Sequence, residues 1–163
     1  LNLIEWGYER LIVATQFPNF AVVQQNIAGM RDAIAESERP IVLEIMKCGK
    51  TPEEFRNLLA DALPKADPRC ALVASGSLLA AWAIESIRTL GLRYPDDVGL
   101  LCAEEPDWAQ ALWPTLSCVQ QPTRELAQIA WDLLARRMSG EGEAPITIRC
   151  DARINFRGSV KSS

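Results

Sequence analysis

The chain has 163 residues, of which 48% are hydrophobic and 23% are charged, and this composition fits one globular domain with a substantial apolar core. Its net charge of -4 excludes a general electrostatic attraction for nucleic acid within these residues. The lack of histidine excludes Ser-His-Asp and Cys-His catalysis and the common histidine zinc sites. No apolar run approaches the ~20 residues of a membrane span, and we expect a soluble, cytoplasmic protein.

Four apolar, β-prone runs divide the first two thirds of the chain, at residues 11–14, 41–45, 70–74 and 98–102. Apolar residues recur at helical spacing between them, as at Val23, Ile27, Met30 and Ile34. Repeated strand–helix–strand units predict an α/β fold, a parallel sheet flanked by helices on both faces. Nearly continuous apolar strands agree with burial on both sides of the sheet.

The segment Thr51-Pro52-Glu53-Glu54 is a strong helix start, because it combines a capping box with proline at the first helical position. The chain also begins inside an expected helix, at Leu1, and we expect it to be a fragment of a longer protein.

The last third is predicted to begin with a short strand at residues 116–119, followed by Pro122 and an amphipathic helix. Its apolar residues are expected to face inward: Leu126, Ile129, Ala130, Leu133 and Leu134. Two β-like pieces follow, at residues 146–149 and 153–157.

The five cysteines are odd in number, widely spaced and mostly embedded in apolar runs. This pattern favours buried free thiols over a disulfide framework. They are Cys48, Cys70, Cys102, Cys118 and Cys150.

Ligands of open parallel sheets bind at the carboxyl ends of the strands, so the residues directly after each strand are the candidate binding site. These residues offer hydrogen-bonding groups and two aromatic faces, which suits a polar small molecule. They are Gln16, Phe17 and Asn19 after the first strand, Ser75 and Ser77 after the third, and Glu104 and Trp108 after the fourth. For Asn19, Ser75 and Ser77, helix capping is an equally good explanation.

Catalysis is not expected. Glu104 and Glu105 are adjacent on an extended segment, so their carboxylates point to opposite sides and do not converge on one substrate atom. The chain carries neither G-x-G-x-x-G nor G-x-x-x-x-G-K-[ST], and we expect no nucleotide cofactor and no metal.

The helix predicted after Ser77 is apolar on all sides for about two turns, up to Ile84. One side can pack on the sheet and the other needs a second cover. We expect a subunit interface at Leu78, Ala81 and Trp82, with a fully buried central helix as the alternative.

An ordered series of short motifs resembles the lactose-repressor (LacI/GalR) family of transcription regulators. The residues that carry the resemblance lie at 3–13 (LIEWGYERLIV), 28–33 (AGMRDA), 71–81 (ALVASGSLLAA), 90–105 (LGLRYPDDVGLLCAEE), 113–122 (WPTLSCVQQP) and 154–160 (INFRGSV). The match extends over almost the whole chain in the family's order.

This resemblance implies a periplasmic-binding-protein-like core of two lobes with a small-molecule effector between them, a sugar or a related polar metabolite. Residues 1–163 then form mainly the carboxyl-terminal lobe, and residues 122–145 cross to a missing amino-terminal lobe. The family's effector-contacting positions fall on Asn26, Ser75, Glu104 and Gln121. The family's residues at the first three are arginine, asparagine and aspartate, so the effector is not identified by the resemblance.

The resemblance further implies a homodimer that binds DNA only through a helix-turn-helix headpiece preceding Leu1. Two other functions remain open. A solute-binding protein of a transporter would have the same fold, and a small α/β enzyme is disfavoured by the absent histidine.

Overall fold

A single sheet organises the protein in a computed structural model, which describes residues 1–63, 65–140 and 144–162. Its six strands lie in the order β2-β1-β3-β4-β5-β6. Five are parallel, as the sequence predicts, and β6 is antiparallel to β5. The strands are β1 (Arg10–Thr15), β2 (Val42–Lys47), β3 (Cys70–Ala74), β4 (Gly99–Cys102), β5 (Ser117–Gln120) and β6 (Arg153–Asn155).

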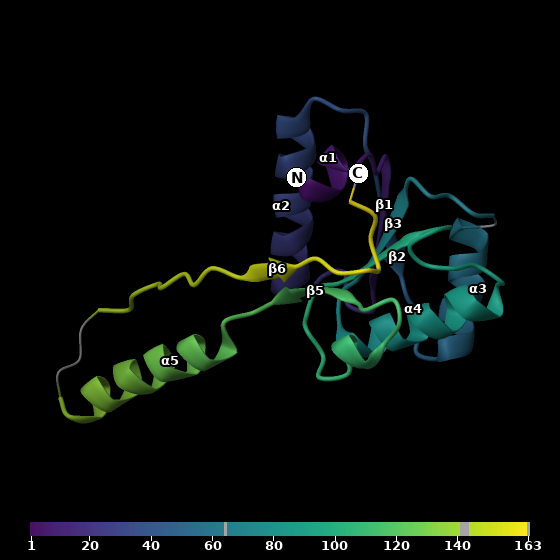
Figure 1. The fold of residues 1–163 in the computed structure, drawn as a ribbon. Helices are drawn as coiled ribbons and strands as arrows, with labels where there is room; N and C mark the ends of the chain where they lie inside the picture. Colours follow the sequence, from purple (N-terminus) through teal and green to yellow (C-terminus); the bar gives the residue numbers. More distant parts are fainter. Residues whose placement is uncertain (64, 141–143, 163) are drawn as a thin grey trace.

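Helices cover both faces of this sheet (Figure 1). The short α1 (Asn2–Glu5) and the long α2 (Ala21–Ser37) lie on one face, and α3 (Pro52–Ala62) and α4 (Ser77–Thr89) pack together on the other. The central strands β3 and β4 are buried at every residue, because both of their faces are covered. The predicted α/β fold is confirmed.

The predicted capping box begins α3, with one difference. Thr51 Oγ1 accepts a hydrogen bond from the Glu54 N–H at 3.2 Å, but the Glu54 carboxylate accepts from the N–H of Lys50, at 2.6 Å, rather than from Thr51. A Cβ on Gly49 would lie 2.1 Å from Glu54 Oε2. Glycine at position 49 therefore leaves the space into which the carboxylate folds back.

The carboxyl-terminal segment is tied to the middle of the sheet through Ser159, whose side chain is fully buried. Its Oγ donates to the Leu100 carbonyl at 2.6 Å and accepts from the Ser117 N–H at 2.7 Å. The Ser159 carbonyl accepts from the Leu100 N–H at 2.8 Å. One residue of the tail thus joins β4 to β5.

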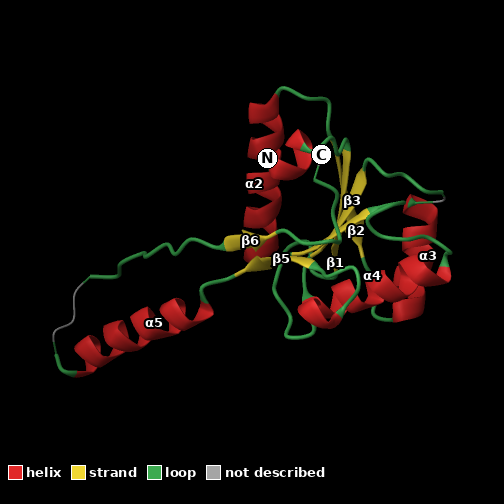
Figure 2. Cartoon of the chain, in the orientation of Figure 1, coloured by secondary structure: helices red, strands yellow, loops and turns green. Residues whose placement is uncertain are grey.

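Helix α5 (Thr123–Met138) projects away from the sheet (Figures 1 and 2), and none of its residues is buried. The expectation that its apolar stripe faces inward is wrong for this chain, since the helix extends past the body that could cover it. Among its larger apolar side chains, Trp131 is 65% and Met138 77% exposed.

The strand predicted at residues 146–149 is also wrong, because these residues form no strand in the structure. Ile146 and Ile148 are about half exposed, and a strand needs a neighbouring strand to take its backbone hydrogen bonds. The following strand, β6, has such a neighbour in β5 and is confirmed over a shorter range than predicted.

The cysteines are all free thiols, and four of the five are buried, as the sequence predicts; Cys150 is half-buried. Burial raises the pKa of Cys48 to about 11 and that of Cys70 to about 12, so both remain neutral thiols at physiological pH. Across the described part of the chain, no helix is both long and apolar enough to cross a membrane.

Candidate functional site

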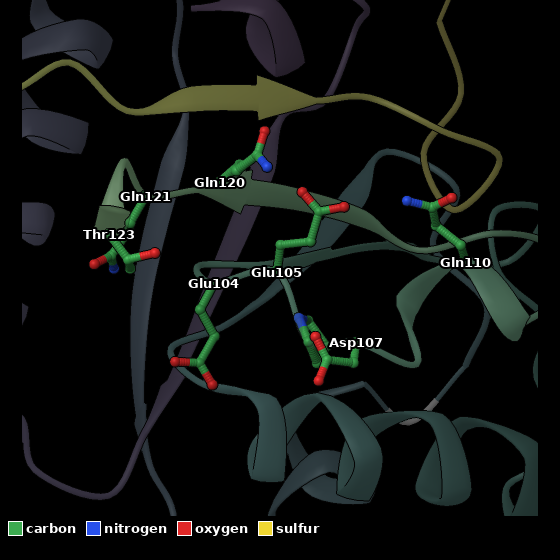
Figure 3. A pocket seen from close by; sticks show the side chains of 8 residues that line it. Glu104, Glu105, Asp107, Gln110, Gln120, Gln121 and Thr123 are labelled. Atoms are coloured by element: carbon green, nitrogen blue, oxygen red, sulfur yellow. The ribbon is translucent and has the colours of Figure 1, made fainter. Parts of the chain in front are cut away.

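A pocket of about 470 Å³ opens at the carboxyl ends of β4 and β5 (Figure 3), the edge of the sheet where ligands of this fold class bind. The turn after β4, the short 3-10 helix η1 (Ala109–Ala111) and the connection from β5 to α5 supply its walls. Its lining residues are Glu104, Glu105, Pro106, Asp107, Gln110, Gln120, Gln121 and Thr123.

Glu104 is directed toward the start of α4. Its Oε1 accepts a hydrogen bond from the backbone N–H of Ser77, the first residue of that helix. The first turn of a helix carries free N–H groups and a partial positive charge, so a carboxylate is stabilised there. The helix has no capping side chain of its own, and Glu104, in the turn after β4, takes that role.

Glu105 points the other way, toward β5 and β6 (Figure 3). Its Oε1 forms an ion pair with the Arg157 guanidinium, and its Oε2 accepts from Asn155 Nδ2 at 2.6 Å. The Arg157 hydrogen bond, with a smaller contribution from Asn155, holds the pKa of the Glu105 carboxyl below its usual range. Arg157 also donates to the Leu116 carbonyl at 2.8 Å, which fixes the ion pair against the sheet.

The two adjacent carboxylates therefore diverge, as the sequence predicts, and each is engaged by the protein itself. This arrangement offers hydrogen-bond acceptors and negative charge to a ligand but no pair of groups aimed at one reacting atom. Within the described ranges, no group of three or more His, Cys, Asp or Glu side chains is arranged to hold a metal ion.

The predicted binding residues divide into three groups. Glu104 and Gln121 line the pocket, and Ser77, at the α4 start, binds Glu104 through its backbone N–H. Ser75 follows β3 and is not among the lining residues. The residues after β1 lie farther along the same edge. There Gln16 donates to the Gly49 carbonyl at 3.0 Å, Asn19 is exposed, and Phe17 stacks on Phe20 with ring centroids 4.8 Å apart.

Trp108 and Asn26 also lie outside this pocket. Trp108 packs against the core cluster on the α3 and α4 face. Asn26 lines a second, mostly apolar cavity of about 570 Å³ between α1, α2 and the sheet. Gln121 lines both cavities, so the two are neighbours that meet at this residue.

The predicted interface residues on α4 differ in exposure. Leu78 is 55% exposed and Ala81 is also exposed. Trp82 is half-buried and lies edge-on to Phe55 of α3, at a centroid distance of 6.2 Å. Helix α4 is therefore covered on two sides, by the sheet and by α3, with a narrower free face than its sequence suggests.

Several residues of the site were missed from the sequence. Gln120 and Thr123 lie at or just after the end of β5, and Phe20 follows β1, so the strand-end rule that predicted Gln16 would have included them. Gln110 lies in η1, farther from a strand end. Arg157 gave no such signal, because its contact with Glu105 spans 52 residues of sequence.

Comparison with known proteins identifies the family to which this fold and pocket belong. Residues 2–160 match the family model described as a periplasmic binding protein-like domain. The chain belongs to this periplasmic binding protein-like family. A probable opine utilization operon repressor of Rhizobium rhizogenes is 39% identical over 94 residues, which cover 57% of this chain and 48% of that protein. The ribose operon repressor of Haemophilus influenzae is 24% identical over 163 residues, covering 98% and 48%.

Solved structures of transcriptional regulators share the fold. A complex of the transcriptional regulator CelR with cellobiose has a TM-score of 0.80 at 23% identity, covering 96% of this chain and 48% of that one. A LacI family regulator from Enterococcus faecium with bound ribose has a TM-score of 0.83 at 21% identity, covering 99% and 60%. The resemblance to the lactose-repressor family is thereby confirmed. The chain spans about half the length of the curated relatives named above.

Proposed function

We propose that this chain is the effector-sensing region of a LacI-type transcription regulator and is not an enzyme. The observation that carries the proposal is the pocket at the ends of β4 and β5, on a fold whose matched relatives are named repressors of opine and ribose operons. Those names also favour a regulator over a solute-binding protein of a transporter. A bacterial transcription regulator works in the cytoplasm. DNA contact would come from a headpiece outside these 163 residues.

Helix α5 is the proposed connection to a second lobe. Leu126, Leu134 and Met138 are each at least 41% exposed, and a helix with such an apolar side is stable when a partner covers it. The pocket lies where the chain leaves β5 for this helix, at Gln121 and Thr123. An effector held there contacts the main lobe and the crossing segment together, and so can bias their relative placement.

The proposed dimer contact is the free face of α4 around Leu78 and Ala81. Both side chains are exposed, and an exposed leucine beside small residues lets a second helix approach closely. Trp82 lies on the side of α4 that contacts α3, where it packs against Phe55.

The test uses the full-length regulator and an operator fragment from its own promoter. We expect a polar metabolite to change operator affinity at least tenfold, and Gln121→Ala to reduce that response without changing the affinity of the effector-free protein. The matched control is Gln128→Ala, an exposed residue of α5 outside the pocket. Turnover of any metabolite, abolished by Glu104→Gln, would contradict the proposal.

A further inference from the structure

The pocket at the ends of β4 and β5 carries three carboxylates, and its described lining residues include no lysine or arginine. Two positive features do lie beside it, the α4 start and Arg157. A pocket that used either of them freely would attract an anionic ligand.

Both positive features are already occupied by the pocket's own carboxylates. Glu104 accepts from the Ser77 N–H at the α4 start, where a ligand's phosphate or carboxylate would otherwise bind. Arg157 is paired with Glu105, and both side chains are only 16% exposed. An anionic ligand would therefore meet negative charge at both places.

The pocket still has free hydrogen-bond acceptors. Glu105 has both oxygens engaged, but Glu104 Oε2 accepts no hydrogen bond from any described residue, and the same holds for the Asp107 carboxylate. In Figure 3 the Glu104 and Asp107 side chains both extend toward the α4 side of the pocket. These carboxylate oxygens are free to accept N⁺–H donors from a ligand.

We infer that the effector carries a protonated amine, held by the free oxygens of Glu104 and Asp107. The inference rests on the proposed function and names the ligand class of the same site. The amides of Gln110, Gln120 and Gln121 supply donors and acceptors for hydroxyl or carbonyl groups elsewhere on the ligand.

The test is a thermal-shift and calorimetry screen of the full-length regulator. The probes are amino sugars, amino acid amides and polyamines, each beside its N-acetylated counterpart, together with neutral sugars and sugar acids. We expect stabilisation by an amine and at least tenfold weaker binding of its acetylated form, because acetylation removes the charge while keeping the rest of the molecule.

Two variants link binding to the site. Asp107→Asn and Glu104→Gln should each weaken amine binding about ten- to a hundredfold, the range for a charge-assisted hydrogen bond. Asp107→Asn disturbs no described contact, so it remains informative if Glu104→Gln perturbs α4. Glu85→Gln, exposed farther along α4, is the control.

The outcomes separate the inference from the proposed function. Binding of a sugar acid, or equal binding of an amine and its acetylated form, overturns the amine and leaves the sensor standing. Amine binding that Asp107→Asn and Glu104→Gln both leave unchanged also overturns it. Binding of no probe counts against both.

Discussion

The carboxylate of Glu104, at the end of β4, accepts a hydrogen bond from the backbone N–H of Ser77, the first residue of α4. The contact couples a pocket residue to the helix that carries the proposed dimer face. A ligand that draws the Glu104 carboxylate into the pocket therefore competes with the α4 start for the same group.

Replacing Glu104 by glutamine should lower the free energy of unfolding by about 1 kcal/mol, because a neutral amide interacts less well with the helix start. Chemical denaturation measures the difference. Glu53→Gln removes an exposed first-turn charge from α3 and should cost less than about 0.5 kcal/mol. Equal effects of the two substitutions would show that the Ser77 contact contributes nothing.

Glu105 should give stability that depends on pH. Its folded pKa is lowered by Arg157, so the stabilisation is fully present above the ordinary value of about 4.5 and is lost as the pH falls through the folded value. We expect Glu105→Gln to be about 1 kcal/mol less stable than the wild type at pH 7, allowing for solvent screening. The two stability curves should converge in acid, and a constant difference down to pH 2 would contradict the assignment. Asp32→Asn, exposed on α2, is the control.

Ser159→Ala should destabilise the protein by about 2 kcal/mol, because it leaves the buried Leu100 carbonyl and Ser117 N–H without the hydroxyl that serves both. Ser162→Ala, at an exposed position three residues later, should have no measurable effect. Thermal unfolding of the two variants side by side makes the comparison. If they unfold alike, the tail is not joined to β4 and β5 as described.

The α4 face should control self-association. Leu78→Asp places a charge on the most exposed apolar residue of that face and should shift the full-length regulator toward the monomer in sedimentation. Leu78 is a cleaner site than Trp82, whose replacement would also remove the contact with Phe55. Arg88→Gln is the matched surface control. An unchanged sedimentation coefficient for Leu78→Asp would rule this interface out.

The parallel sheet could be predicted because each strand and helix is marked by a pattern within its own short stretch of sequence. The apolar runs around Val13, Val73 and Leu101 are long enough to be buried on both faces, and the helix between β2 and β3 starts at a recognisable cap, Thr51. The incorrect expectations share one cause. Residues 146–149 and the apolar side of α5 have strand and helix patterns, but a pattern does not say which surface will cover it.

The sequence predicted at which edge of the sheet the site lies, but not which side chains form it. Position after β4 selected both Glu104 and Trp108, but Glu104 lines the pocket and Trp108 packs against the core. Neither the Glu105–Arg157 pair nor the Glu104 contact with α4 follows from strand order. Both contacts join residues that are far apart in sequence and depend on how the chain packs in three dimensions.

Because β5 and β6 are paired, the segment that connects them could be deleted without separating the two strands. Gln120 and Arg153 are register partners in neighbouring antiparallel strands, although 33 positions separate them in sequence. A two-residue Asn-Gly turn is the usual link between such partners. Deleting residues 121–152 and joining the two ends by that turn should leave a smaller protein that folds cooperatively. The sheet and its covering helices would then fold without the segment that carries α5, and that segment could be altered independently of them.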